Sequence, residues 1–198
     1  ESASIVNGTD SSIDLSEYSL KITRDNGNEY NLTLNDDTGD SNNNGLLESG
    51  DLLLIVRSEA GNLCSIYLDC IENNIQFIEW NDLYRINGDD ALELYNNLTL
   101  LDVIGIPGID PGSGWDVAGI QEATKNHTLL RKSNITEGNT NWNESSGDEN
   151  NSDTQRMLKD IQSIYMPNRV IVYGKNGGES LKNTIPFVGF YEPNADGS

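Results

Sequence analysis

Oxygen-bearing side chains in residues 40–51 have the spacing of a calcium-binding loop. They fall at the first, third, fifth, ninth and twelfth positions, and glycine at the sixth permits the sharp turn that such a loop needs. The predicted calcium ligands are Asp40, Asn42, Asn44, the carbonyl group of Leu46, Glu48 and Asp51. The last position holds Asp51 rather than glutamate, and no flanking helices are evident, so we expect modest affinity. An ordinary turn rich in asparagine and glycine is the alternative.

Seven Asn-x-Ser/Thr sequons form a second group, because this tripeptide is the acceptor for N-linked glycans. Nearly all lie in segments predicted as loops or strand edges: Asn7, Asn31, Asn97, Asn126, Asn134, Asn143 and Asn150. We expect several of them to carry glycans in an extracellular protein. The alternative is that a polar loop composition matches the tripeptide by chance.

The only two cysteines, Cys64 and Cys70, could form a disulfide. A straight strand would separate them by about 20 Å, so they can pair only if the chain turns between them. Buried free thiols are the alternative. The even number of cysteines and the sequons both favour an oxidising compartment.

The chain offers no set of residues for catalysis. His127 is the single histidine and lies inside a sequon, and no nucleophile elbow, paired-histidine zinc motif or phosphate-binding glycine loop occurs. The pair Asp89-Asp90 suits a turn better than acid–base chemistry. Three tryptophans could stack on sugars, but packing in or beside a core is the simpler interpretation for Trp115 and Trp142. We therefore predict that the protein is not an enzyme.

The composition narrows the classes of partner. The 198 residues carry 12 Lys and Arg against 32 Asp and Glu, a formal net charge of −20. Such a surface repels phosphate backbones and attracts multivalent cations, which argues against nucleic-acid binding. No apolar run approaches the roughly 20 residues of a membrane helix. The chain starts at Glu1 without a signal peptide, so we interpret it as a processed or excised segment.

Short apolar segments separated by turn residues predict an all-β protein. Tyr18–Ile22 and Tyr30–Leu34 alternate around a hairpin turn, and Leu52–Val56 is an apolar run typical of a strand buried on both faces. Other predicted strands are 91–95, 100–104, 128–131, 169–173 and 185–191, and residues 155–164 could form a short helix or strand. Residues 143–154 are predicted to form an exposed loop. This pattern indicates an antiparallel β-sandwich.

Several motifs, in order, resemble the lamin-tail domains of secreted microbial proteins. The matching segments are Asn87-Gly88-Asp89-Asp90-Ala91-Leu92-Glu93-Leu94-Tyr95, Asp102-Val103-Ile104-Gly105, Asp110 to Trp115, Thr128-Leu129-Leu130-Arg131-Lys132 and Gly138-Asn139-Thr140 to Trp142. Asn7-Gly8-Thr9, Asp14-Leu15 and Tyr18-Ser19-Leu20 look like the family's first hairpin. The resemblance covers about residues 5–160. It implies an immunoglobulin-like β-sandwich that serves as a binding or structural module and has no catalytic activity.

The sequence departs from this family at its ends. In the family another strand precedes the first hairpin, whereas only six residues precede Asn7 here. The segment containing Phe187, Val188, Phe190 and Tyr191 looks like the missing strand, and joining Ser198 to Glu1 would restore the usual order. We therefore divide the chain into a sandwich at residues 1–160, with the calcium-type loop at 36–51, and a strand extension at 161–198.

An open sandwich edge can accept a strand from a neighbour. Because the donor and acceptor surfaces differ, such a contact propagates as a fibre. We predict a subunit or repeat of an extracellular glycosylated filament, whose partners are other copies of itself and covalently attached glycans. Residues 185–191 folding back onto their own domain, or forming a loose tail, are the alternatives. The second functional candidate is a carbohydrate- or surface-binding module of a larger secreted protein.

Overall fold

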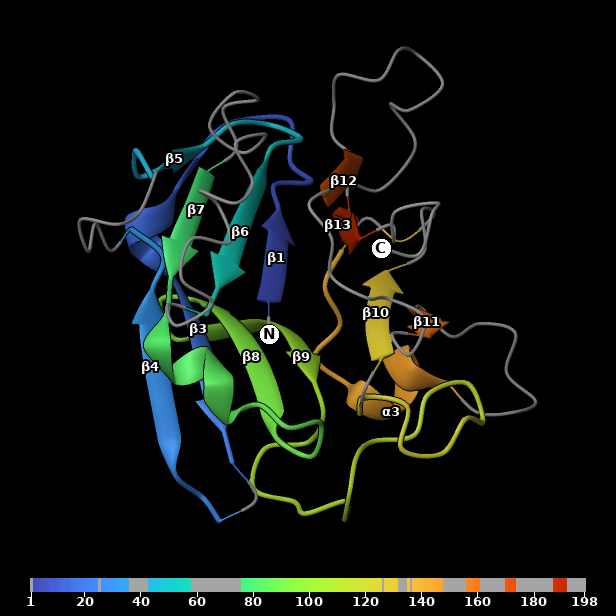
Figure 1. The fold of residues 1–198 in the computed structure, drawn as a ribbon. Helices are drawn as coiled ribbons and strands as arrows, with labels where there is room; N and C mark the ends of the chain where they lie inside the picture. The colour runs from blue at the N-terminus through green and yellow to red at the C-terminus, as the bar shows by residue number, and fades with distance from the viewer. Residues whose placement is uncertain are drawn as a thin grey trace.

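The computed structural model describes residues 2–24, 26–35, 43–57, 76–125, 127–131, 135, 137–147, 156–160, 170–173 and 187–191. Within these ranges the chain consists mainly of strands, as predicted, and most strand pairs are antiparallel (Figure 1). No described helix has both the length and the hydrophobicity needed to cross a membrane.

One layer is a four-stranded antiparallel sheet with the strand order β4-β3-β8-β9. The strands are β3 (Tyr18–Thr23), β4 (Glu29–Thr33), β8 (Ala91–Asn96) and β9 (Thr99–Ile104). The predicted hairpin of β3 and β4 is confirmed, with Ile22 opposite Tyr30. Its turn needs a residue in the left-handed region, which Gly27 supplies at a φ of 79°.

The second layer is a three-stranded sheet with the order β1-β6-β7. It contains β1 (Ser2–Val6), β6 (Leu52–Val56) and β7 (Gln76–Glu79). All five residues of β6 are buried, which confirms the prediction of a strand covered on both faces. The pairing of β6 with β7 is parallel, so the sandwich is not wholly antiparallel as predicted. A parallel pair requires a long crossover, and residues 57–75 provide it.

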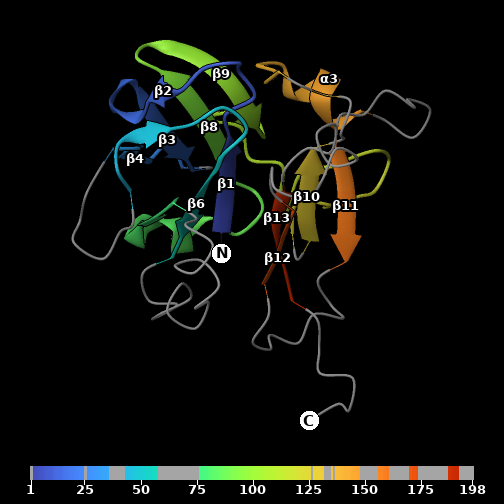
Figure 2. The ribbon, with the colours of Figure 1, turned by 90° about the horizontal axis from the view of Figure 1, so that it is seen from above.

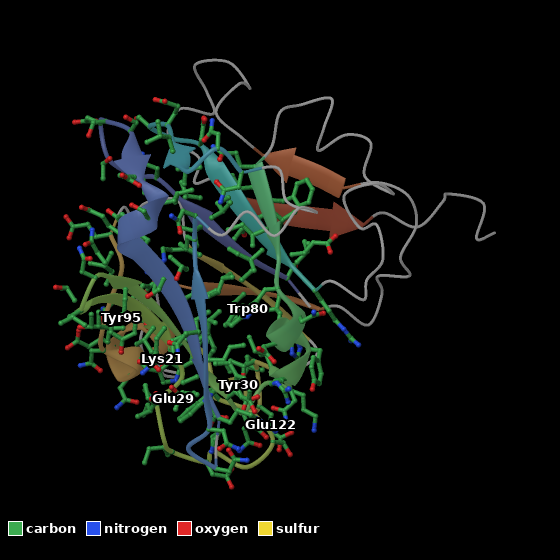
Figure 3. All side chains as sticks on the ribbon, turned by 90° about the vertical axis from the view of Figure 1, so that its left-hand side faces the viewer. Lys21, Glu29, Tyr30, Trp80, Tyr95 and Glu122 are labelled. Atoms are coloured by element: carbon green, nitrogen blue, oxygen red, sulfur yellow. The ribbon has the colours of Figure 1, made fainter. Side chains whose placement is uncertain are left out.

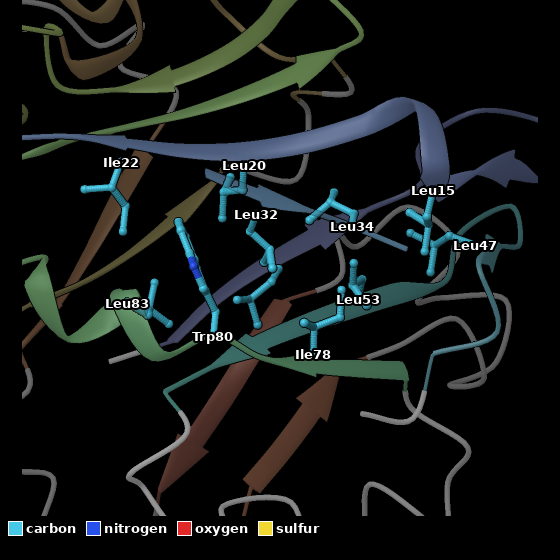
Figure 4. Packing of buried hydrophobic residues seen from close by; sticks show 11 residues of the cluster. Leu15, Leu20, Ile22, Leu32, Leu34, Leu47, Leu53, Ile78, Trp80 and Leu83 are labelled. Atoms are coloured by element: carbon cyan, nitrogen blue, oxygen red, sulfur yellow. The ribbon is translucent and has the colours of Figure 1, made fainter. Parts of the chain in front are cut away.

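The main hydrophobic core lies between these two sheets (Figure 4). Alternation along each strand directs Leu20, Ile22 and Leu32 inward from the four-stranded sheet. From the opposite sheet come Leu53, Ile55 and Ile78, each with no exposed surface. The two facing layers with one core between them confirm a β-sandwich.

Further elements surround the sandwich. Three short pairs are β2 (Ile13–Asp14) with β5 (Leu46–Leu47), β10 (His127–Arg131) with β11 (Arg156–Asp160), and β12 (Val170–Tyr173) with β13 (Phe187–Tyr191). The short helices are η1 (Leu15–Glu17), η3 (Asn81–Arg85) and α3 (Trp142–Ser146). Helix α3 corrects the first part of the predicted exposed loop, residues 143–146, because burial of Trp142, Ser145 and Ser146 fixes this turn against the sandwich. Residues 148–154 of that prediction lie outside the described residues.

A second, smaller core covers the outer face of β9. It contains Val103, Trp115, Val117, Ala123 and Trp142. The rings of Trp115 and Trp142 meet edge to face, with their centroids 6.4 Å apart. Trp80 is 6% exposed and lies in the main core. All three tryptophans therefore pack inside the protein, as the simpler interpretation predicted, and they do not form an exposed sugar-stacking surface.

Candidate functional site

Strand β1 is an edge strand, and its outer side is the candidate site for assembly. It pairs with β6 from Ser2 opposite Val56 to Val6 opposite Leu52. Just beyond the strand, the amide of Asn7 donates to the carbonyl of Asp51 at 3.1 Å. Backbone groups alternate in direction along a strand, so those of Ser4 and Val6 point away from β6. Among the described strands, none is hydrogen-bonded to this outer side.

The side chains of β1 hold this edge in place. Ala3 and Ile5 pack against the main core, whereas Ser2 at the start of the strand is exposed. The strand is therefore fixed by burial on one face and by the ladder to β6, and its second row of backbone groups remains on the outer edge. An unpaired edge of this kind is a template for another strand.

The predicted donor segment lies close to this edge. Phe187, Val188, Phe190 and Tyr191 all belong to β13, which is confirmed as a strand. It pairs antiparallel with β12, with Val170 opposite Tyr191 and Ile171 opposite Phe190. Strand β13 runs beside β1 without belonging to the same sheet (Figure 2).

Asn7 closes the end of β1 by hydrogen bonds from its side chain. Its Nδ2 donates to the carbonyls of Leu47, at 2.8 Å, and Ser11, at 2.7 Å. Its Oδ1 accepts from both the amide and the hydroxyl of Thr9. The residue is 2% exposed. A glycan on Nδ2 would replace one of these protons and would have no space in this fold, so we expect Asn7 to act as a structural residue and to carry no glycan.

Three other predicted acceptors are exposed. Asn31 lies on β4, opposite Lys21 and therefore on the outer face of its sheet. Asn97 lies in the turn between β8 and β9 at a φ of 52°, a left-handed conformation that asparagine tolerates. Asn143 lies in α3. Asn126, Asn134 and Asn150 lie outside the described residues.

The calcium-type loop is described only in part, because Asp40 and Asn42 lie outside the described residues. Gly45 has a φ of 78°, so the predicted sharp turn is present. Asn44 Oδ1 accepts a hydrogen bond from the Leu46 amide at 2.9 Å. The side-chain amide of Gln76 bridges the same turn. Its Nε2 donates to the backbone carbonyl of Leu46 at 2.6 Å, and its Oε1 accepts from the backbone amide of Asn44.

Two of the predicted calcium ligands therefore already take part in hydrogen bonds within the protein. Glu48 is exposed, Asp51 is half-buried, and the Asp51 amide donates to the Glu48 carbonyl at 2.9 Å. No group of three or more His, Cys, Asp or Glu residues suited to a metal occurs in the described part of the chain. Cys64 and Cys70 lie in the crossover outside the described ranges, so their pairing stays a prediction.

A charged network centred on the buried Glu93 lies on the outer face of β3 and β8, and Figure 3 labels its members Lys21, Glu29 and Tyr95. Glu93 is 2% exposed and accepts hydrogen bonds from the hydroxyls of Thr23, at 2.6 Å, and Tyr95, at 2.5 Å. Lys21 Nζ lies 3.1 Å from Glu93 and 3.2 Å from Glu29. This network is not visible in the sequence, because it joins β3 and β4 to β8, which lies far along the chain from both.

The network shifts the proton affinities of its members. Burial by itself lowers the pKa of Lys21, but hydrogen bonds to Glu93 and Glu29 outweigh it and raise that pKa above its ordinary value. Burial, followed by the hydrogen bond to Glu93, raises the pKa of the Tyr95 phenol. Lys21 therefore stays charged and Tyr95 stays neutral at physiological pH. These groups satisfy one another's hydrogen-bonding capacity and stabilise the sheet. Neither Lys21 nor Tyr95 is in its deprotonated, nucleophilic form.

A cluster of arginine and tyrosine side chains lies beside η3, at one end of the sandwich. The guanidinium of Arg85 stacks on the ring of Tyr30 of β4, at 4.4 Å, and on that of Tyr84, at 4.6 Å. Arg57, which follows β6 of the three-stranded sheet, also contacts the ring of Tyr84. Asp82 also binds Arg85, at 2.7 Å. These contacts connect the two layers at the surface.

Comparison of the chain with protein-family models, with curated proteins and with solved structures gives no match. The resemblance to lamin-tail domains therefore stays a prediction.

Proposed function

We propose that this protein is a structural, non-enzymatic unit of an extracellular glycosylated filament, assembled by strand complementation. The observation that carries the proposal is the outer edge of β1, whose backbone groups at Ser4 and Val6 have no ladder partner among the described strands. In an assembled filament, strand β13 of one unit pairs with β1 of the next. Backbone hydrogen bonds supply the affinity, and Phe187, Phe190 and Tyr191 are the anchoring side chains.

The position of β13 within the chain supports this proposal. A strand that lies beside an acceptor edge in its own chain is suited to exchange, because the same contact can form with a second copy. The donor and acceptor surfaces are different, so the exchanged contact does not close into a two-fold dimer and continues as a fibre. Consecutive repeats of one long chain could use the same contact. The proposal includes the lamin-tail identity with its immunoglobulin-like fold. In that family another strand precedes the first hairpin, and in the filament β13 of the neighbouring unit would take that place.

Calcium has a structural role in the proposed unit. The loop at 40–51 connects the outer turn at Gly45 to β6, the strand that holds β1, so a bound ion would stiffen the support of the acceptor edge. Titration calorimetry at millimolar calcium is the direct test. We expect binding by the wild-type chain and loss of binding in Glu48→Gln combined with Asp51→Asn. Asp10→Asn, an exposed acid outside the loop, is the control for the change of charge.

The decisive experiment moves the donor strand within the chain. In a permuted chain, residues 185–198 precede Glu1, so each unit can fill its own β1 edge. We expect the wild-type chain to form regular filaments in negative-stain micrographs, a chain ending at residue 184 to form none, and the permuted chain to be a stable monomer. A wild-type chain that stays monomeric at high concentration, or a permuted chain that still polymerises, refutes the proposal.

A glycan placed at the β1 edge provides an independent test. Ser2→Asn creates the sequon Asn-Ala-Ser at the exposed start of β1, and Glu17→Asn creates Asn-Tyr-Ser beside the Asn97 turn. Both positions are exposed, so both variants should fold. We expect the Ser2→Asn glycoprotein to be monomeric and the Glu17→Asn glycoprotein to assemble normally. A signal on a glycan array without any polymer would instead favour a carbohydrate-binding module.

A further inference from the structure

A pocket of about 220 Å³ lies between β9 and α3, with a predicted glycan acceptor in its wall. Leu100, Val103 and Trp142 contribute apolar surface, and Ile106 and Pro107 of the following crossing extend it. Thr140, Asn141 and Asn143 line it as polar residues. The pocket is smaller than the roughly 300–1,000 Å³ typical of sites for free small molecules. It is larger than the roughly 10–15 Å³ that a single water needs.

We propose that this pocket holds the first sugar of a glycan attached to Asn143. This inference rests on the proposal that the protein is a secreted glycoprotein. A tethered sugar is present at a high effective concentration, so even a shallow pocket can hold it without the affinity that a free ligand requires. The carbon-bound hydrogens of a sugar ring form an apolar face, which suits Ile106 and Pro107, while Thr140 can hydrogen-bond its hydroxyls.

The side chains around Asn143 leave it available for modification. Asn141 Nδ2 donates to Glu144 at 2.9 Å, and Asn139 Nδ2 donates to the same carboxylate at 3.5 Å. Asn143 is exposed, and within the described part of the chain its side chain makes no hydrogen bond. This is the opposite of Asn7, whose Nδ2 donates both protons inside the fold. Asn31 and Asn97 are exposed as well, but Asn143 is the one described acceptor that also lines the pocket.

The test compares glycosylated chains from a eukaryotic secretory host. Asn143→Gln removes the glycan proposed to occupy the pocket, and Asn31→Gln and Asn97→Gln remove other glycans as matched controls. Glycopeptide mass spectrometry measures occupancy, and thermal unfolding measures the consequence. We expect Asn143 to be occupied and Asn143→Gln to lower Tm by about 2–4 °C, the shift for one modest contact in a domain of this size. The control variants should leave Tm unchanged.

A double-mutant cycle separates a seated glycan from a merely attached one. Ile106→Ala should lower Tm more in the glycosylated wild-type chain than in the Asn143→Gln chain, and equally in the wild-type and Asn31→Gln chains. An unmodified Asn143 beside a modified Asn31 or Asn97 overturns the inference, and so does a modified Asn143 without coupling to Ile106. If no sequon is modified, the glycoprotein part of the proposed function falls as well, whereas filament formation remains separately testable.

Discussion

Replacement of Asn7 by alanine should destabilise the protein strongly, although its sequence context predicts a glycan acceptor. The substitution leaves the buried Leu47 carbonyl without its donor, which costs about 1–3 kcal/mol, and removes further bonds to Ser11 and Thr9. Water can replace some of the partly buried bonds, so we expect a total loss of about 3 kcal/mol. For a domain of this size that corresponds to a fall in Tm of about 6–12 °C.

Thr9→Ala is the matched control for the loss of Asn7. It destroys the same sequon but leaves the Asn7 side chain and its two donated bonds in place, so we expect a loss of about 1 kcal/mol or less. Urea unfolding can be followed by tryptophan fluorescence, because all three tryptophans are buried. The measurement uses the permuted chain, in which assembly does not contribute. Equal effects of the two variants, or a glycan found on Asn7, would refute the structural role of this side chain.

Two further predictions concern the four-stranded sheet of β4, β3, β8 and β9 and its turns. In denaturant unfolding, Gly105→Ala should lower the free energy of unfolding by about 3 kcal/mol, because the new Cβ would lie 2.6 Å from Trp115 Nε1. Gly27 has the same φ of 79° but open space around it. Gly27→Ala is therefore the control and should cost only the backbone strain, about 1–2 kcal/mol. Because the pKa values of Lys21 and Tyr95 are raised in the folded protein, the unfolded chain loses these protons first as pH rises. The free energy of unfolding should therefore be constant from pH 6 to 9 and fall above about pH 10. In urea titrations at different pH values, Tyr95→Phe should weaken this alkaline loss of stability, and an unchanged loss would contradict the assignment.

Much of the sandwich could be predicted because its strands carry local signals. Alternation in β3 and β4, the hairpin turn at Gly27 and the apolar run of β6 are properties of neighbouring residues. The positions of β11 and β13 were also anticipated, as a short helix or strand and as a strand. Helix α3 was missed, because its residues are polar and their burial depends on Trp142 reaching a core built by distant strands.

The candidate sites were predictable only as residue types. A sequon has the same tripeptide at Asn7 and at Asn143, yet one side chain is enclosed by the turn at Leu47 and the other lies in the wall of a pocket. The calcium-type spacing anticipated the turn at Gly45, but not the Gln76 amide that bridges it from β7. The parallel pairing of β7 with β6 likewise has no local signature.

By itself, the sequence determined the all-β class, the strongly acidic surface and the strands of the main hairpins, because charge and side-chain periodicity are local properties. Only the tertiary structure decided that β1 is an edge, that Asn7 is enclosed and that Glu93 is buried with Lys21. These features depend on which strands become neighbours. Which strands pair depends on the burial of side chains that are far apart in the sequence, and local sequence patterns do not reveal these contacts.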